Sequence, residues 1–390
     1  MRIDTFLEFL RYCIGDEQKP PVSAKGIDWM EMMAWAESQA IVGVVYQGIL
    51  KGGKELEIPF DALMEWVGYA QQIEAQNRLV NQRCIEIAAA FRKDGFETCI
   101  LKGQGNAAMY PSPLLRNPGD IDLWVRRQNN DERQSNRLTS SSRQKDIRTE
   151  IKEIIGFVKE RNPEARALYH HIDLDEFKGV EVEVHYRPSF MNSPIYNHRL
   201  QKWFRYHTES TDTAELADGV GRINVPNWEF NVVFQLSHVY NHLLHEGIGL
   251  RQIIDYYYLL RQSNDIRQSN RLTDSFRQKD IRTEIGDTLR YLGLWEIAGA
   301  MMWVLNEVLG LEEKYLIAPK DERRGRLLLA EIMKGGNFGF YDVENQRADS
   351  QLKKNWLRIR RDLRMMRYFP SECLWEPVFR VYHFFWRMVH

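Results

Sequence analysis

Three things are scarce in this sequence: cysteine, long apolar runs and net charge. The four cysteines (Cys13, Cys84, Cys99 and Cys373) lie far apart without a CxxC spacing, so neither a zinc site nor a disulfide framework is predicted. No apolar run approaches the ~20 residues of a membrane helix, and the N-terminus lacks the basic and then apolar stretch of a signal peptide. The formal net charge of -1 gives no general attraction to nucleic acid. We therefore expect a cytoplasmic protein with no membrane span and no DNA partner.

The composition is that of a folded globular protein, with 44% hydrophobic and 27% charged residues. A chain of 390 residues exceeds what one hydrophobic core usually serves, so two or three packed sub-domains are expected.

Hydrophobic periodicity divides the chain into three parts. Residues 1–94 place apolar side chains at three- and four-residue spacings, which predicts a helical region that Gly95 ends. Residues 95–227 predict a small αβ domain with strands at FETCILKG, DIDLWV, LYHHIDLDEF and GVEVEVHYRP, the last two joined as a hairpin at Lys178-Gly179. Residues 228–390 form a second helical region. The predicted fold class is α+β, a small mixed β-sheet unit flanked by N-terminal and C-terminal helices.

A 19-residue sequence occurs twice, at 133–151 and at 267–285, and the two copies match at 17 of 19 positions. Sequences this alike are not each adapted to a different core, and two polar copies do not make a solenoid. We interpret them as one segment inserted twice into surface loops, where lengthening costs about 1 kcal/mol or less. A duplicated binding arm is the alternative interpretation.

The strongest chemical signal is the pair Asp120 and Asp122 in DIDLWV. Residues i and i+2 of a strand share a face, so both carboxylates project together and repel unless a cation lies between them. In VEVEVH, the same alternation places Glu181, Glu183 and His185 on one face. If the two strands are neighbours, a three-carboxylate cluster forms that suits Mg²⁺ or Mn²⁺ and phosphoryl transfer. A DxD alone is weak evidence and more often marks a solvated strand edge; the glycine-flanked LKGQG before it and the acid-bearing strand after it favour the metal interpretation here.

The segments LKG, R-x-x-GDIDLWV and VEVHY together resemble the polymerase-beta-like nucleotidyltransferase superfamily. They are most similar to its branch of uncharacterised nucleotidyltransferase family proteins. LSHVYNHLLHEGIGLRQIIDYYYLL and KGGNFG also resemble that branch, so the similarity covers most of the chain apart from the insertions. It implies a nucleotidyltransferase-fold αβ unit in which Asp120 and Asp122 are the metal pair. Glu183, rather than Glu181, would be the third acid.

The resemblance also implies nucleotide-binding residues around the first strand and the turn before the second. Lys102 and Gly103 would form the phosphate-facing turn, although Gln104 stands where the superfamily usually has a small residue. Arg116 and Lys102 suit triphosphate oxygens, or salt bridges to acids instead. Gly119 allows close backbone approach.

Weaker candidates lie in the C-terminal region. His238, His242 and His245 share one helix face, which suggests packing more than zinc because HVYNH lacks the glutamate of HExxH. On the next helix, Arg251 and Asp255 are spaced as an intrahelical pair.

The sequence thus predicts a metal-dependent enzyme that transfers a nucleoside monophosphate from an NTP, expected to be ATP, to an acceptor. The acceptor stays open among small molecules, proteins and RNA. The alternative is a catalytically weak nucleotide-sensing or protein-interaction module on the same fold.

Overall fold

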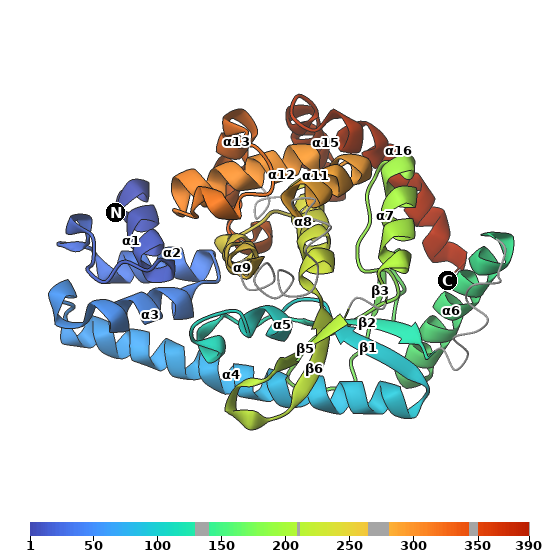
Figure 1. The fold of residues 1–390 in the computed structure, drawn as a ribbon, viewed down its shortest axis with the longest axis horizontal. Helices are drawn as coiled ribbons and strands as arrows, with labels where there is room; N and C mark the ends of the chain where they lie inside the picture. Colours follow the sequence, from blue (N-terminus) through green and yellow to red (C-terminus); the bar gives the residue numbers. More distant parts are fainter. Residues whose placement is uncertain (129–139, 209–210, 264–280, 343–349, 390) are drawn as a thin grey trace, which may run out of the picture.

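The computed structural model describes residues 1–128, 140–208, 211–263, 281–342 and 350–389 (Figure 1). The N-terminal region is helical, as predicted: α1 (Ile3–Ile14), η1 (Val22–Ala24), α2 (Trp29–Ser38), α3 (Val42–Gly52), η2 (Gly53–Leu56) and α4 (Phe60–Lys93). Helix α2 begins where the Asp28 side chain accepts hydrogen bonds from the amides of Met30 and Glu31.

The αβ region follows in the order β1 (Phe96–Ile100), α5 (Gln104–Ala107), η3 (Pro113–Leu115), β2 (Ile121–Arg127), α6 (Ser140–Arg161), β3 (His171–Asp173), β4 (Val182–His185), α7 (Pro194–Tyr206), β5 (Thr211–Glu215), η4 (Ala217–Gly219) and β6 (Arg222–Pro226). The C-terminal region comprises α8 (Trp228–His245), α9 (Leu250–Arg261), α11 (Ile281–Leu292), α12 (Trp295–Trp303), η5 (Val304–Val308), η6 (Glu313–Tyr315), α13 (Glu322–Gly335), η7 (Asn337–Gly339), α15 (Gln351–Met366) and α16 (Pro370–Val389).

The central sheet is mixed and has the strand order β1-β2-β4-β3. β1 runs antiparallel to β2, β2 is parallel to β4, and β3 returns antiparallel to β4. The β3–β4 connection contains Gly179 with a φ of 85°, a left-handed conformation that glycine adopts at little cost. The four predicted strands and the α+β class are therefore confirmed, and β5 and β6 add a separate two-stranded sheet.

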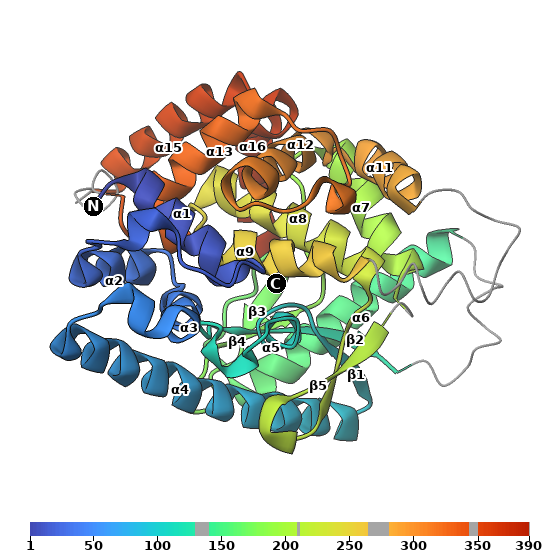
Figure 2. The ribbon, with the colours of Figure 1, turned by 60° about the vertical axis from the view of Figure 1, so that its left-hand side comes forward.

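Helices cover both faces of the sheet, and β2 is therefore buried along most of its length. Ile121, Leu123 and Val125 join an apolar cluster with α6 and the C-terminal half of α4, which runs beneath the sheet in Figures 1 and 2. On the opposite face Trp124 stacks on Phe230 of α8, with ring centroids 5.2 Å apart. This second face belongs to a larger cluster that also joins the N-terminal helices to the C-terminal ones.

The duplicated segment is helical where it is described, so its interpretation as a loop is wrong for residues 140–151. These residues form the first turns of α6, and Ile151 is 4% exposed. In the second copy Ile285, the equivalent residue, lies in α11 and is 1% exposed. The sequence RTEI thus supplies a buried isoleucine to two different cores. Residues 133–139 and 267–280 of the copies lie outside the described residues.

Among the described helices, none has the length and apolar content that crossing a membrane requires.

Candidate functional site

A cavity of about 880 Å³ lies between the sheet and the C-terminal helices. Helix α8, which stands above the sheet in Figure 1, contributes histidines to it. Its remaining charged lining comes from the ends of β1, β2 and β4 and from α9, α15 and α16, and includes Lys102, Asp120, Glu181, Glu183, Arg251, Arg358, Arg380 and Arg387.

The two acid-bearing strands are direct neighbours. In the parallel β2–β4 ladder Asp122 lies opposite Glu183, and Asp120 immediately precedes β2. The condition for a three-carboxylate cluster, that VEVEVH pairs with DIDLWV, is therefore met. Asp122 is fully buried, whereas the Asp120 side chain is 19% exposed and faces the cavity.

Lys102, two residues after the end of β1, places its ammonium group near both aspartates. Its Nζ lies 3.0 Å from Oδ1 of Asp122 and 3.7 Å from Oδ2 of Asp120. Burial alone would lower the pKa of Lys102, but the charges of Asp120, Asp122 and Glu183 outweigh it and raise that pKa. The pKa of Asp120 is also raised, chiefly by burial and then by the charge of Asp122. The salt bridge to the acids is therefore formed, and it shows that the two carboxylates converge on one point.

His185 is a second positive group beside the acids. Its Nε2 lies 3.2 Å from Oδ1 of Asp122 and 3.1 Å from Oε2 of Glu183. Burial opposes its charged form, but hydrogen bonds to these two carboxylates raise the pKa of His185 to about 9. The alternation in VEVEVH predicts that His185 shares a face with Glu183. Its contact with Asp122, in contrast, depends on the register between β2 and β4.

A series of side chains at hydrogen-bonding distance extends from Lys102 along α8. Lys102 Nζ is 3.0 Å from Nε2 of His238, which is 2.8 Å from Nε2 of His242, and Nδ1 of His242 is 2.9 Å from Oε2 of Glu246. Because an ammonium group only donates, His238 accepts from Lys102. The shared face of His238 and His242 is therefore directed at the acid cluster. His245 lines the same cavity, and burial lowers its pKa to about 3.

The donor set near Asp122 fits a divalent cation. Single ligand atoms of Asp122, Glu183 and His185 lie within 4.8 Å of one another. Oδ2 of Asp122 is buried and has no hydrogen-bond partner among the described residues, which is costly for a carboxylate oxygen. Carboxylate oxygens are the ligands that Mg²⁺ and Mn²⁺ prefer.

Two predicted nucleotide-binding side chains lie elsewhere. Arg116 is buried and forms a bidentate ion pair with Asp255 of α9, with Nε–Oδ1 and Nη2–Oδ2 distances of 2.8 and 2.7 Å. Gln104 is buried against α4, where its amide donates to Asn81. Neither side chain lines the cavity. The salt-bridge alternative for Arg116 is thus the one formed, with Asp255 as the partner in place of an acid of the cluster.

The two predicted glycines differ in their roles. Gly103 has a φ of 61° at the turn into α5, and an added Cβ would lie 3.4 Å from the carbonyl oxygen of Asp120. Gly119 lines the cavity next to Arg251, whose Nη1 donates to the carbonyl of Pro118 at 2.9 Å. Gly103 therefore shapes the turn, and Gly119 forms part of the cavity wall.

Sequence reasoning missed the two histidines at the beginning of β3, His170 and His171, and the arginines of α15 and α16. His170 and His171 line the cavity, and burial lowers the pKa of His171 to about 4. The adjacent pair HH beside a strand was a visible signal, whereas only the tertiary fold places Arg358 and Arg380 at the cavity.

The mixed sheet, with acids on two adjacent strands and helices on both sides, is that of a nucleotidyltransferase-fold domain. The sequence model of a family described as uncharacterised nucleotidyltransferase matches residues 25–295, and the chain belongs to that family. No curated protein matches the chain, and no solved structure does.

Proposed function

We propose that this protein transfers a nucleoside monophosphate from an NTP, with ATP as the nucleotide, to an acceptor, and that pyrophosphate leaves. The observation that carries the proposal is the placement of Asp122 opposite Glu183 on adjacent strands, with Asp120 directed at the same point. The cavity of about 880 Å³ is within the size range of small-molecule sites.

Asp120, Asp122 and Glu183 would hold Mg²⁺ or Mn²⁺. Such an ion, when bound, neutralises charge on the transferring phosphoryl group. Glu181 is the less suitable third acid, because its side chain is exposed and its β4 neighbour Glu183 is the residue opposite Asp122.

The remaining groups bind and orient the substrates. Lys102 is placed to contact phosphate oxygens as a point charge, and His238 supports its ammonium group from the other side. Arg358 of α15 brings positive charge to the cavity and would contact the pyrophosphate, whereas Arg380 of α16 is already in an ion pair with Glu376.

Asp120 would accept the proton of the acceptor hydroxyl. As the acceptor oxygen bonds to the α-phosphorus, the bond to pyrophosphate breaks and the acceptor hydroxyl loses its proton. The Asp120 carboxylate faces the cavity, so it is the acid of the cluster placed to accept this proton. The acceptor is a small molecule, a protein or RNA.

A nucleotide-sensing module is the second candidate. Lys102 and His185 already compensate the carboxylates, and Gln104 is used in packing rather than at the phosphate turn. A protein of this kind would bind an NTP without releasing pyrophosphate.

The test is incubation of the protein with each α-labelled NTP, Mg²⁺ or Mn²⁺, and fractionated cell extract. We expect label transfer that is lost when Asp120→Ala and Asp122→Ala are combined, and retained in the matched control Glu181→Gln. Transfer that survives the double substitution contradicts the enzyme proposal. NTP binding without any transfer favours the sensing module.

A further inference from the structure

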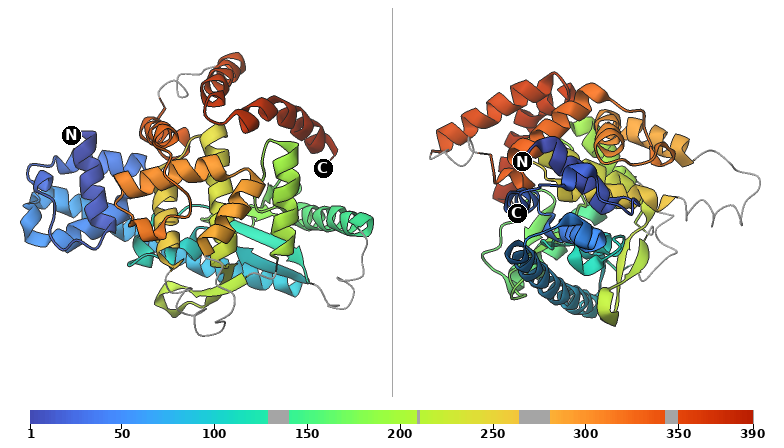
Figure 3. Two further views of the ribbon diagram at one scale, coloured as in Figure 1. Left: turned by 45° about the horizontal axis from the view of Figure 1, so that its top comes forward. Right: turned by 90° about the vertical axis from the view of Figure 1, so that its left-hand side faces the viewer.

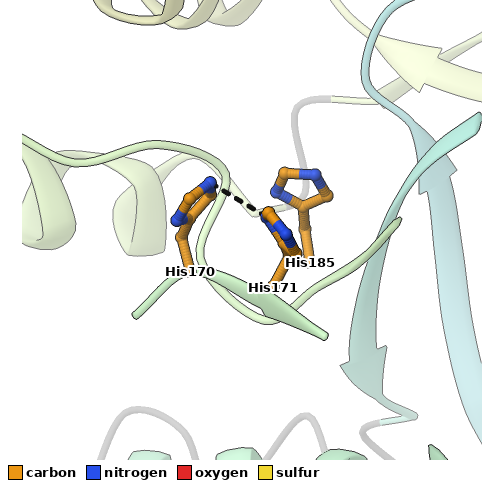
Figure 4. A group of neighbouring side chains, drawn as sticks. All are labelled: His170, His171 and His185. Carbon is orange, nitrogen blue, oxygen red and sulfur yellow. Dashed lines mark hydrogen bonds between the residues drawn. The ribbon is translucent and has the colours of Figure 1, made fainter. Parts of the chain in front are cut away.

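Three histidines meet beside the acid cluster. His171 begins β3, His170 immediately precedes it and His185 ends β4, and Figure 4 shows their three rings close together. One ring nitrogen of each lies within 4.8 Å of the other two. Nε2 of His170 is 3.0 Å from Nδ1 of His171.

We propose that His170, His171 and His185 bind a divalent transition-metal ion of the Zn²⁺ class, with Glu183 as the fourth ligand. Imidazole nitrogen suits Zn²⁺, Co²⁺ or Ni²⁺, whereas Mg²⁺ prefers oxygen. This ion would share Glu183 with the oxygen-bound cation proposed at the aspartates, and its binding does not depend on nucleotidyl transfer.

The distances are close to those of a tetrahedral site. With Zn–N bonds of about 2.0–2.1 Å, two ligand atoms of a tetrahedron lie about 3.3 Å apart. The separations are 3.0 Å between Nε2 of His170 and Nδ1 of His171, 3.4 Å between Nδ1 of His171 and Oε2 of Glu183, and 3.1 Å between that oxygen and Nε2 of His185. Small side-chain rotations would bring the remaining nitrogens into range.

The experiment measures metal binding directly. The full-length protein is treated with chelator and titrated with Zn²⁺ in excess Mg²⁺, and the affinity is read by competition with a chromophoric chelator. Co²⁺ titration adds an absorption spectrum that reports four-coordination. We expect one Zn²⁺ per chain and the intense visible bands of tetrahedral Co²⁺.

Variants assign the ligands. Loss of an outer-shell partner already costs 10–100-fold in metal affinity, so His170→Gln and His171→Gln should each weaken Zn²⁺ binding by about 100-fold or more. His198→Gln, a change at an exposed histidine of α7, is the matched control and should leave the affinity unchanged. Asp120→Asn should keep Zn²⁺ binding while weakening Mg²⁺-dependent nucleotide binding, so the two proposals fail separately. Absence of stoichiometric Zn²⁺ binding in the wild type, unchanged affinity in His170→Gln and His171→Gln, or an equal loss of affinity in the control His198→Gln overturns the site.

A second, independent feature is the exposed face of the C-terminal helices, which lie at the periphery of the molecule in Figure 3. On α16 the residues Val378, Val381, Tyr382, Phe384, Phe385 and Met388 are each more than half exposed. They fall on one side of the helix, and the charged residues Glu376, Arg380 and Arg387 fall on the other. A contiguous apolar face of this kind marks an interaction surface.

The neighbouring helix α15 combines exposed apolar side chains with positive charge. Trp356, Ile359 and Leu363 are 63%, 50% and 62% exposed and lie at helical spacing. Residues 350–389 contain nine lysines and arginines against three acids, although the whole chain has a net charge of -1. Like charge opposes the pairing of two copies of this surface, whereas an anionic surface complements it.

We infer that α15 and α16 lie on an anionic phospholipid bilayer, with the apolar face of α16 in the headgroup boundary. Basic amphipathic helices with exposed Trp, Phe and Leu bind membrane surfaces in this way. The cavity-lining arginines Arg380 and Arg387 lie on the same helix, so binding would hold the site close to the membrane.

Vesicle sedimentation tests this inference. We expect binding to phosphatidylcholine vesicles that contain phosphatidylglycerol and at least tenfold weaker binding to phosphatidylcholine alone. Val381→Asp with Phe385→Asp, and separately Arg360→Glu with Arg367→Glu, should each reduce binding at least tenfold, and Ile195→Asp on α7 should not. Equal binding to both vesicle types, or a dimer in sedimentation velocity that Val381→Asp disrupts, contradicts the inference.

Discussion

The buried ion pair between Arg116 and Asp255 gives the sharpest prediction about stability. The Asp255 carboxylate accepts two hydrogen bonds from Arg116, one from the Tyr110 hydroxyl at 2.6 Å and one from the Asn106 amide at 3.0 Å. Arg116 and Asp255 are 4% and 3% exposed, so solvent does not screen the pair. We therefore expect Arg116 to hold α9 against the turn before β2 and to have no direct role in nucleotide binding.

The expected magnitude follows from burial. Removing one partner of a buried ion pair costs about 3–5 kcal/mol, because the other charge is left uncompensated. Arg116→Met and Asp255→Leu should each lower the free energy of unfolding by about this amount, and the double variant should lose much less than the sum. Burial raises the pKa of Asp255, but the charge and hydrogen bonds of Arg116 outweigh it and lower that pKa. The pair therefore contributes its full stabilisation of the folded state above about pH 4. This stabilisation is lost as the pH falls through the lowered pKa of Asp255.

Urea denaturation followed by tryptophan fluorescence measures these differences, with the exposed Asp212→Asn as the control. Titration with ATP and Mn²⁺ should give an unchanged Kd for folded Arg116→Met. An Arg116→Met protein that is as stable as the wild type but binds ATP much more weakly would refute a purely structural role for Arg116. It would instead support the predicted contact of Arg116 with the triphosphate.

Two further predictions concern acids. Glu183→Gln should abolish Mn²⁺-supported ATP binding and Glu181→Gln should not, as calorimetry will measure; the reverse pattern would make Glu181 the third acid. Glu372 is buried, and this burial raises its pKa to about 7 even though the amides of Asn192 and Ser193 donate to it. Its contribution to stability should therefore be complete below about pH 4.3 and fall by roughly 3 kcal/mol as the pH rises through 7. Glu372→Gln should remove this pH dependence in denaturation measurements; an unchanged pH profile would contradict it.

Local pattern was sufficient for much of the fold. Alternation in DIDLWV and VEVEVH predicted two strands and the faces of Asp120, Asp122 and Glu183, because a strand repeats every two residues. Three- and four-residue spacing likewise predicted the helices on both sides of the sheet. These features depend on residues close together in the sequence.

What sequence could not supply depends on long-range packing. The sequence left two partners open for Arg116, a nucleotide phosphate or an acidic side chain. Its partner in the structure is Asp255, which lies 139 residues away in the sequence. The polar composition of the duplicated segment predicts a loop, yet each copy contributes one buried isoleucine to a helix, Ile151 in α6 and Ile285 in α11. The adjacent pair His170 and His171 was visible in the sequence, but its proximity to His185 depends on the β3–β4 register, which local pattern does not determine.

The central claim is that Asp120, Asp122 and Glu183 form one metal-binding cluster for a nucleotide. Electron paramagnetic resonance of Mn²⁺ in the presence of ATP tests it most directly, because free and protein-bound Mn²⁺ have different spectra. The account predicts a protein-bound Mn²⁺–ATP signal in the wild type that is lost in Asp122→Asn and kept in Glu181→Gln. A bound signal that persists in Asp122→Asn would contradict it.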